Sequence, residues 1–238
     1  MNLILFDRHE IARPLPRSDP RATHLLNVLR RDVGGTFDAG LINGARGKGT
    51  VAAIGANELT LSFAWGDEPP PLDPITLLVG LPRPQTARKI LQEATSLGVS
   101  AVHFVATEKS DPNYRDSVLW SSGEWRRHLL AGAEQAFCTR IPEVTHDRPL
   151  SDLIPALATT GTRVALDNYE SVTALSAIER ITLPAVIAVG AERGWSATER
   201  EWFRQHGFVL AGLGTRVLRV ETACIAALAL VKARAGLW

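Results

Sequence analysis

Apolar runs alternate with segments of helical spacing between residues 75 and 231. Ala87–Leu97 and Glu124–Phe137 each repeat apolar residues at three- and four-residue intervals, which predicts amphipathic helices. Ser196 and Glu199 form a capping-box pair that opens a further helix, closed by Gly207. The predicted buried strands are Ile75–Leu81, Val102–Ala106, Val164–Leu166, Ala185–Val189 and Val209–Leu213. This alternation, which ends in an alanine-rich helix over 223–231, predicts an α/β domain with a mostly parallel sheet covered by helices on both faces.

The first 66 residues have a different pattern. Short strand-like runs at Thr36–Ile42, Thr50–Ile54 and Leu59–Phe63 are separated by glycine- and asparagine-rich turns, and one helix is predicted over Thr23–Arg30. Four prolines within Asp67–Pro74 can continue neither a helix nor a central strand, so they mark a linker. The sequence therefore predicts a small β-barrel domain over residues 1–68 and an α/β domain over residues 73–238.

Composition narrows the class of protein only a little. A chain of 238 residues with 45% hydrophobic and 21% charged residues is typical of a globular protein, and its net charge of +1 favours no class of partner. Met1–Asp7 lacks the pattern of a signal peptide, and no apolar run is long enough to span a membrane. Two cysteines and the absence of zinc-ligand spacing predict a reduced, cytoplasmic protein without a metal.

Three glycine clusters fail as phosphate-binding motifs. Gly44–Gly49 lacks the flanking residues of a P-loop and is predicted as a hairpin turn carrying two basic side chains. Gly212–Val217 and Gly190–Gly194 do not complete a dinucleotide fingerprint, which also belongs in the first strand–helix turn of its domain. A nicotinamide-dependent oxidoreductase is therefore a disfavoured alternative.

Two predicted strands nevertheless end in glycine with charged residues just beyond them. Ala185–Val189 runs into Gly190–Gly194, and Val209–Leu213 runs into Gly214 and two arginines. Ligands of α/β proteins bind at the carboxyl ends of strands, where glycine lets the backbone approach closely. A small-molecule site is therefore predicted here.

The same stretch carries a family resemblance. Val189–Ser196 together with Leu213–Ala223 resembles the paired signature of the 16S ribosomal RNA uridine-N3 methyltransferases (RsmE type) of the SPOUT superfamily. Three further segments match that family in order and spacing: His24–Arg30, Lys89–Val99 and Glu134–Glu143. The resemblance therefore spans nearly the whole chain. The chain departs from the family pattern at Ala191 and Arg193, which replace a proline and a glycine, at Phe137–Cys138, and at Asn2–Leu5.

The resemblance implies a PUA-like RNA-binding barrel followed by a SPOUT domain with a trefoil knot. It also implies methyl transfer from S-adenosylmethionine to N3 of a uridine in 16S ribosomal RNA of the small subunit, which is a step of rRNA processing. The active unit that it implies is a homodimer. A noncatalytic RNA- or ribosome-binding protein that keeps the fold is the competing hypothesis.

The resemblance also assigns candidate residues. Glycines allow close backbone approach and aliphatic side chains offer an apolar floor for a purine, so the cofactor candidates are Leu166, Val189, Gly190, Glu192, Leu213, Gly214 and Leu218. Fixed cations stabilise a uracil that loses its N3 proton, so the catalytic candidates are Arg216, Arg219 and Glu221. The RNA-binding candidates are His24, Arg30, Arg31, Arg46, Lys48 and Arg140, for which solvated loop charges are the competing interpretation.

Glu221 has two possible roles. It is a candidate base for the N3 proton, but we favour it as the partner that orients Arg219, because buried charges need partners. Arg140 and Glu134 are weaker candidates in the same site.

Overall fold

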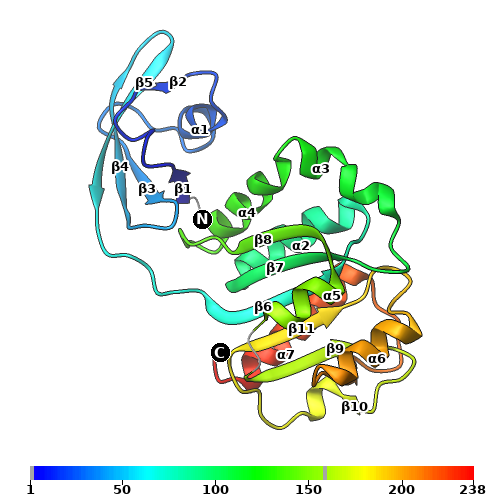
Figure 1. The fold of residues 1–238 in the computed structure, drawn as a ribbon. Coiled ribbons are helices and arrows are strands. Elements are labelled where there is room, and N and C mark those ends of the chain that lie inside the picture. The colour runs from blue at the N-terminus through cyan, green and yellow to red at the C-terminus, as the bar shows by residue number, and fades with distance from the viewer. Residues whose placement is uncertain (1–2, 158–159) are drawn as a thin grey trace. The chain divides into compact units, whose positions relative to one another are not determined.

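The computed structural model describes residues 3–157 and 160–238, which form two compact units (Figure 1). The N-terminal unit contains the chain up to Pro71 together with residues 133–141, and the C-terminal unit contains residues 72–132 and 142–238. Met1 and Asn2, which belong to the N-terminal stretches considered above, lie outside the described residues.

Residues 133–141 fall inside the predicted 73–238 domain but belong to the N-terminal unit. The Thr139 hydroxyl donates to the carbonyl of Gly44 at 2.5 Å, and the N–H of Asn43 donates to the carbonyl of Thr139 at 2.8 Å. The Glu134 carboxylate accepts the backbone N–H of Leu5 at 3.2 Å. These hydrogen bonds join residues about 90 to 130 positions apart. A single boundary in the sequence therefore cannot separate the two units, because one segment of the later part of the chain packs with the earlier part.

The N-terminal unit is a curled, five-stranded mixed sheet. Its order is β1-β3-β4-β5-β2, in which β1 and β3 are parallel and the other pairs antiparallel. Alternate residues point into one core, in which Phe6, Leu25, Phe37, Val51 and Leu59 are buried. The strands are β1 (Leu3–Phe6), β2 (Leu15–Pro16), β3 (Thr36–Leu41), β4 (Arg46–Ile54) and β5 (Glu58–Trp65). The predicted barrel-like domain is confirmed.

One local prediction in this unit is displaced and another is wrong. The helix expected over Thr23–Arg30 begins earlier, as α1 (Pro20–Thr23), because the Asp19 carboxylate caps the N–H of Arg21. It continues only as the π-helical turn η1 (His24–Val28). The turn expected over Gly44–Gly49 is confined to residues 42–45, so Arg46 and Lys48 lie on strand β4.

The C-terminal unit is built on a seven-stranded sheet in which every pair of neighbouring strands is parallel. Its order is β10-β12-β9-β11-β6-β7-β8. The strands are β6 (Asp73–Gly80), β7 (Val99–Ala106), β8 (Glu143–Pro149), β9 (Thr162–Leu166), β10 (Thr173–Ala174), β11 (Ala185–Val189) and β12 (Val209–Gly212). The predicted α/β class with a parallel sheet is confirmed. Strand β11 lies between β6 and β9, although it follows both in the chain.

Helices cover both faces of this sheet, as predicted (Figure 1). Helices α2 and α7 pack together on one face, and α5 and α6 cover the other. The α-helices are α2 (Pro84–Ser96), α3 (Val118–Ser121), α4 (Glu124–Gln135), α5 (Leu150–Leu153), α6 (Ala197–Gln205) and α7 (Val220–Arg234). Short 3₁₀ turns are η2 (Pro112–Asp116), η3 (Ile154–Ala156) and η4 (Leu175–Ala177). Among the described residues, no helix combines the length and the apolar character needed to cross a membrane.

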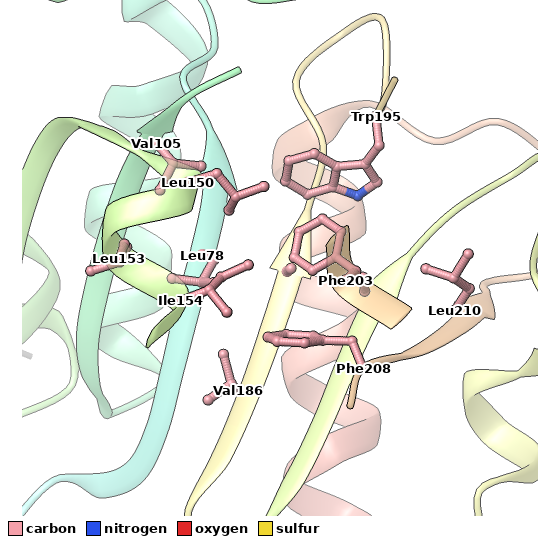
Figure 2. Packing of buried hydrophobic residues seen from close by; sticks show 12 residues of the cluster. Leu78, Val105, Leu150, Leu153, Ile154, Val186, Trp195, Phe203, Phe208 and Leu210 are labelled. Atoms are coloured by element: carbon pink, nitrogen blue, oxygen red, sulfur yellow. The ribbon is translucent and has the colours of Figure 1, made fainter. Parts of the chain in front are cut away.

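An aromatic cluster fills the core between the sheet and α6. The rings of Trp195, Phe203 and Phe208 follow one another, with centroids 4.7 and 4.9 Å apart in edge-on contact (Figure 2). The predicted capping box is present: Ser196 accepts the N–H of Glu199, and the Glu199 carboxylate accepts the N–H of Ser196. The cluster and the cap together fix where the chain leaves β11 and enters α6.

Candidate functional site

A cavity of about 720 Å³ lies at the carboxyl ends of β9, β11 and β12. The direction in which strands are added to the sheet reverses at β6: β7 and β8 lie on one side of it, and β11, β9, β12 and β10 lie on the other. Ligands of parallel α/β sheets bind at such a switch point. The walls of the cavity come from the ends of these strands, the first turns of α2 and α7, and the segment between β12 and α7.

Nine of the ten residues predicted to bind the cofactor or to act in catalysis line this cavity. They are Leu166, Val189, Gly190, Glu192, Leu213, Arg216, Leu218, Arg219 and Glu221. The tenth, Gly214, is not among the lining residues; it is exposed, and its φ of +103° suits glycine at the turn after β12. The aliphatic members supply an apolar surface, and the side chains of Leu166 and Val189 are buried at their strand ends.

The loop Gly190–Trp195, which we call the glycine loop, is held at both ends. A Cβ on Gly190 would lie 2.8 Å from Cα of Gly194, and a Cβ on Gly80 would lie 2.6 Å from the backbone nitrogen of Ala191. Both contacts involve backbone atoms, so the loop folds tightly on itself and against the end of β6. The indole N–H of Trp195 donates to the carbonyl of Leu166 at 3.0 Å, which ties the loop to β9.

Two charged side chains complete the loop's anchoring. The Glu192 carboxylate accepts the backbone N–H of Arg83 at 3.0 Å, at the start of α2. The Lys109 ammonium donates to the carbonyls of Trp195 at 2.7 Å and Arg193 at 3.4 Å. Contacts to α2 and to the segment after β7 therefore support a loop that lacks the proline and glycine of the family pattern.

Glu221 pairs with Lys89 of α2, at 3.0 Å, rather than with Arg219. Burial opposes ionisation of the Glu221 carboxyl, but its own backbone N–H, the Lys89 ammonium and the charge of Arg219 outweigh that cost and hold its pKa below the ordinary value. An ionised carboxylate with a lowered pKa is a poor proton acceptor, so this geometry disfavours Glu221 as the base. The guanidinium groups of Arg216 and Arg219 are solvent-exposed.

Asp167, which lines the cavity, belongs to a buried ion pair that sequence reasoning missed. Asp167, directly after β9, accepts from Nε of Arg200 on α6 at 2.7 Å, with side-chain exposures of 1% and 8%. The same carboxylate accepts the N–H groups of Tyr169 at 2.8 Å and Glu170 at 2.6 Å. An aspartate directly after a predicted strand could have indicated a site residue, but its arginine partner lies 33 positions away in the sequence.

The RNA-binding candidates all lie in the N-terminal unit, where they fall into three groups that differ in their surroundings. Arg46 and Lys48 border a hollow of about 290 Å³ together with Phe137, whose ring centroid lies 5.6 Å from the Arg46 guanidinium. Arg140 is instead tied to Glu68 at 3.2 Å and to the carbonyls of the proline linker. His24, Arg30 and Arg31 lie at or just beyond η1, the two arginines exposed.

Glu134 and Arg140 were also weaker candidates for the catalytic site, but neither lines the 720 Å³ cavity. Burial raises the pKa of the Glu134 carboxyl, which accepts a backbone hydrogen bond from β1. Among the described residues, no group of three or more His, Cys, Asp or Glu side chains could hold a metal ion.

Comparison with known proteins identifies the family. Residues 68–232 match the model of the RNA methyltransferase domain. The chain belongs to this family. A relative from Treponema pallidum, "Ribosomal RNA small subunit methyltransferase E", is 34% identical to this RNA methyltransferase over 100% of the chain and 93% of its own length. A protein of the same name from Bacillus subtilis is 26% identical over 87% of the chain and 85% of its own length.

Solved structures share the fold of this RNA methyltransferase. A probable rRNA-methyltransferase from Porphyromonas gingivalis superposes with a TM-score of 0.82 at 20% identity, covering 98% of both chains. Ribosomal RNA small subunit methyltransferase E from Neisseria gonorrhoeae, solved with S-adenosyl methionine, gives 0.77 at 22% identity, covering 100% of this chain and 98% of its own. Both likenesses extend over the N-terminal and the C-terminal units.

Proposed function

We propose that this chain is an S-adenosylmethionine-dependent methyltransferase that modifies N3 of a uridine in 16S ribosomal RNA. The observation that carries the proposal is the convergence on one cavity of nine residues that the family resemblance assigns to the donor and to catalysis. Membership of the RNA methyltransferase family and the names of the full-length relatives support the same activity.

The cavity fits the methyl donor. Its volume of about 720 Å³ lies within the range of sites for small molecules of this size. Leu166, Val189, Leu213 and Leu218 would form an apolar floor for the adenine, and the tight approach at Gly190 brings backbone groups close to the ligand. S-adenosylmethionine supplies, when bound, an electrophilic methyl group on a sulfonium.

The chain's own residues deal with charge on the uracil. N3 of uridine carries a proton that must leave before or as the new N–C bond forms, and the base becomes negatively charged as it does so. Arg216 and Arg219 border the cavity, and their positive charge can stabilise this developing anion. Lys89 and Glu221 form a neutral pair that fixes the start of α7 beside them.

The N-terminal unit supports the choice of RNA as the substrate. Its hollow places the Arg46 guanidinium beside the ring of Phe137, a combination suited to phosphates and unpaired bases. Lys48 in the same hollow is paired with Asp38 at 2.6 Å, so the support comes from Arg46 and Phe137. We further propose that the enzyme works as a homodimer in the cytoplasm and that the chain through β9, β11 and β12 forms the trefoil knot of the family.

Two measurements test the function. Mass mapping of 16S RNA from a strain lacking the gene should show a uridine without its N3 methyl group, and the wild-type gene should restore that group. Calorimetry should show binding of S-adenosylmethionine to the purified protein. A protein that restores no methylation and binds no donor at millimolar concentration would instead be a noncatalytic RNA-binding relative.

A further inference from the structure

Tyr169 is an exposed aromatic residue at the cavity. It lies in the segment after β9, lines the cavity, and has 76% of its surface exposed to solvent. The core aromatics of the same unit, Trp195 and Phe203, are by contrast fully buried. A large exposed ring beside a ligand cavity is a candidate contact surface rather than part of the core.

The protein holds this ring in place. The backbone N–H of Tyr169 donates to Asp167, whose other carboxylate oxygen is bound by the buried Arg200. The Arg200 guanidinium lies over one face of the Tyr169 ring, 5.2 Å from its centroid. A second ion pair, between Arg200 and Glu170 at 3.2 Å, fixes the next residue. One ring face is therefore backed by a cation, and the opposite face is left to solvent.

Five cationic side chains border the same cavity, and one of them, Lys89, is paired with Glu221. The guanidinium groups of Arg83, Arg193, Arg216 and Arg219 make no hydrogen bond or ion pair within the part of the chain that the structure describes. Lys89 and Arg200 neutralise the carboxylates of Glu221 and Asp167, whereas Glu192 accepts only a backbone N–H and keeps its negative charge. Four arginines therefore face one unneutralised carboxylate among the described lining residues, and the cavity presents a net positive charge next to an open aromatic face, the combination that binds unpaired nucleotides.

We propose that Tyr169 is a stacking residue for a base of the RNA substrate, at or next to the uridine that is methylated. This inference rests on the proposed function. The donor already has an apolar floor in the aliphatic residues at the strand ends, whereas Tyr169 lies on the loop beyond β9 with its free face open. An enzyme that modifies a base must first unstack that base from its neighbours in the RNA. Stacking of the base on an aromatic side chain of the protein then compensates for the stacking that was lost.

The test measures RNA and donor separately. Tyr169→Ala should raise the KM for unmethylated 16S rRNA about 5- to 150-fold, the equivalent of ~1–3 kcal/mol of stacking. The dissociation constant for S-adenosylmethionine, measured by calorimetry, should stay within about twofold of the wild type. Tyr169→Phe keeps the ring and should recover most of the lost RNA affinity.

Val172→Ala is the matched control, because Val172 is 78% exposed in the same segment but does not line the cavity. An unchanged KM for RNA in Tyr169→Ala would overturn the inference while leaving the enzyme function intact. A weakened donor affinity, or a changed oligomeric state by light scattering, would also overturn it, since the ring would then contact the donor or a second copy. If the wild-type enzyme transferred no methyl group, the proposed function itself would fail.

Discussion

Breaking the Asp167–Arg200 pair should destabilise the C-terminal unit and loosen the wall of the cavity. Removing one partner of a buried ion pair costs about 3–5 kcal/mol, because the remaining charge is left buried. Arg200 keeps its bond to Glu170, which is partly exposed, so Asp167→Asn should cost about 3 kcal/mol, at the lower end of that range.

Asp167→Ala should cost more than Asp167→Asn. The asparagine side chain keeps an oxygen that can accept the N–H groups of Tyr169 and Glu170, whereas alanine leaves both without this acceptor. At about 1 kcal/mol for each lost hydrogen bond, Asp167→Ala should cost about 5 kcal/mol.

Urea unfolding followed by tryptophan fluorescence measures these losses in the relevant unit, because five of the six tryptophans lie in the C-terminal unit. A loss of about 3 kcal/mol should lower the midpoint by about 1 M urea. The double variant Asp167→Asn/Arg200→Met should cost at least about 1 kcal/mol less than the sum of the two single variants. Additive losses, or an Asp167→Asn loss below about 1 kcal/mol, would show that the pair carries little of the stability.

Three further predictions concern other parts of the molecule. Gly190→Ala should weaken S-adenosylmethionine binding in calorimetry on the order of 10- to 100-fold, because the new Cβ forces the backbone at Gly194 to shift; an unchanged affinity would refute the assignment of the glycine loop to the donor. Arg219→Ala should reduce methyl transfer on the order of 100-fold or more while the circular dichroism spectrum and unfolding midpoint persist, because this side chain is exposed; near-normal turnover would remove it from the catalytic set. Glu10→Gln should destabilise the N-terminal unit at neutral pH, because bonding to Arg21 lowers the pKa of Glu10 from 4.5 to about 2. That contribution is present above about pH 4.5 and is lost as the pH falls toward 2, so the gap between the thermal midpoints of wild type and variant should be constant above about pH 5 and should close between about pH 4.5 and pH 2; a gap that stays constant down to pH 2 would contradict the ion-pair account.

Regular, strongly patterned elements were predictable from the sequence. The expected strand Ile75–Leu81 and helix Ala87–Leu97 correspond to β6 and α2 with ends displaced by one to three residues. Strand β8 was missed because it lies at the edge of the sheet and mixes exposed polar residues without a clear alternation. The π-helical turn η1 was missed because apolar spacing alone does not distinguish it from an α-helix.

The candidate site was predictable where its residues stand together in the sequence. Glycine-ended strands and the arginines beyond them gave most of the cavity lining. Lys89, Asp167, Arg200 and Tyr169 were not found, because their roles depend on contacts between segments about 30 to 130 positions apart. The partner of Glu221 was assigned wrongly for the same reason, since Lys89 comes from a neighbouring helix.

The place of β11 between β6 and β9 has a consequence for synthesis on the ribosome. A nascent chain that ends before residue 185 already contains both neighbours of β11, but nothing that can fill the space between them. Their facing edges would carry unpaired backbone groups and apolar side chains, which are the features that promote aggregation. The sheet becomes complete only when the last fifth of the chain has left the exit tunnel, so we expect this segment, more than any other, to set how long the newborn protein depends on chaperones.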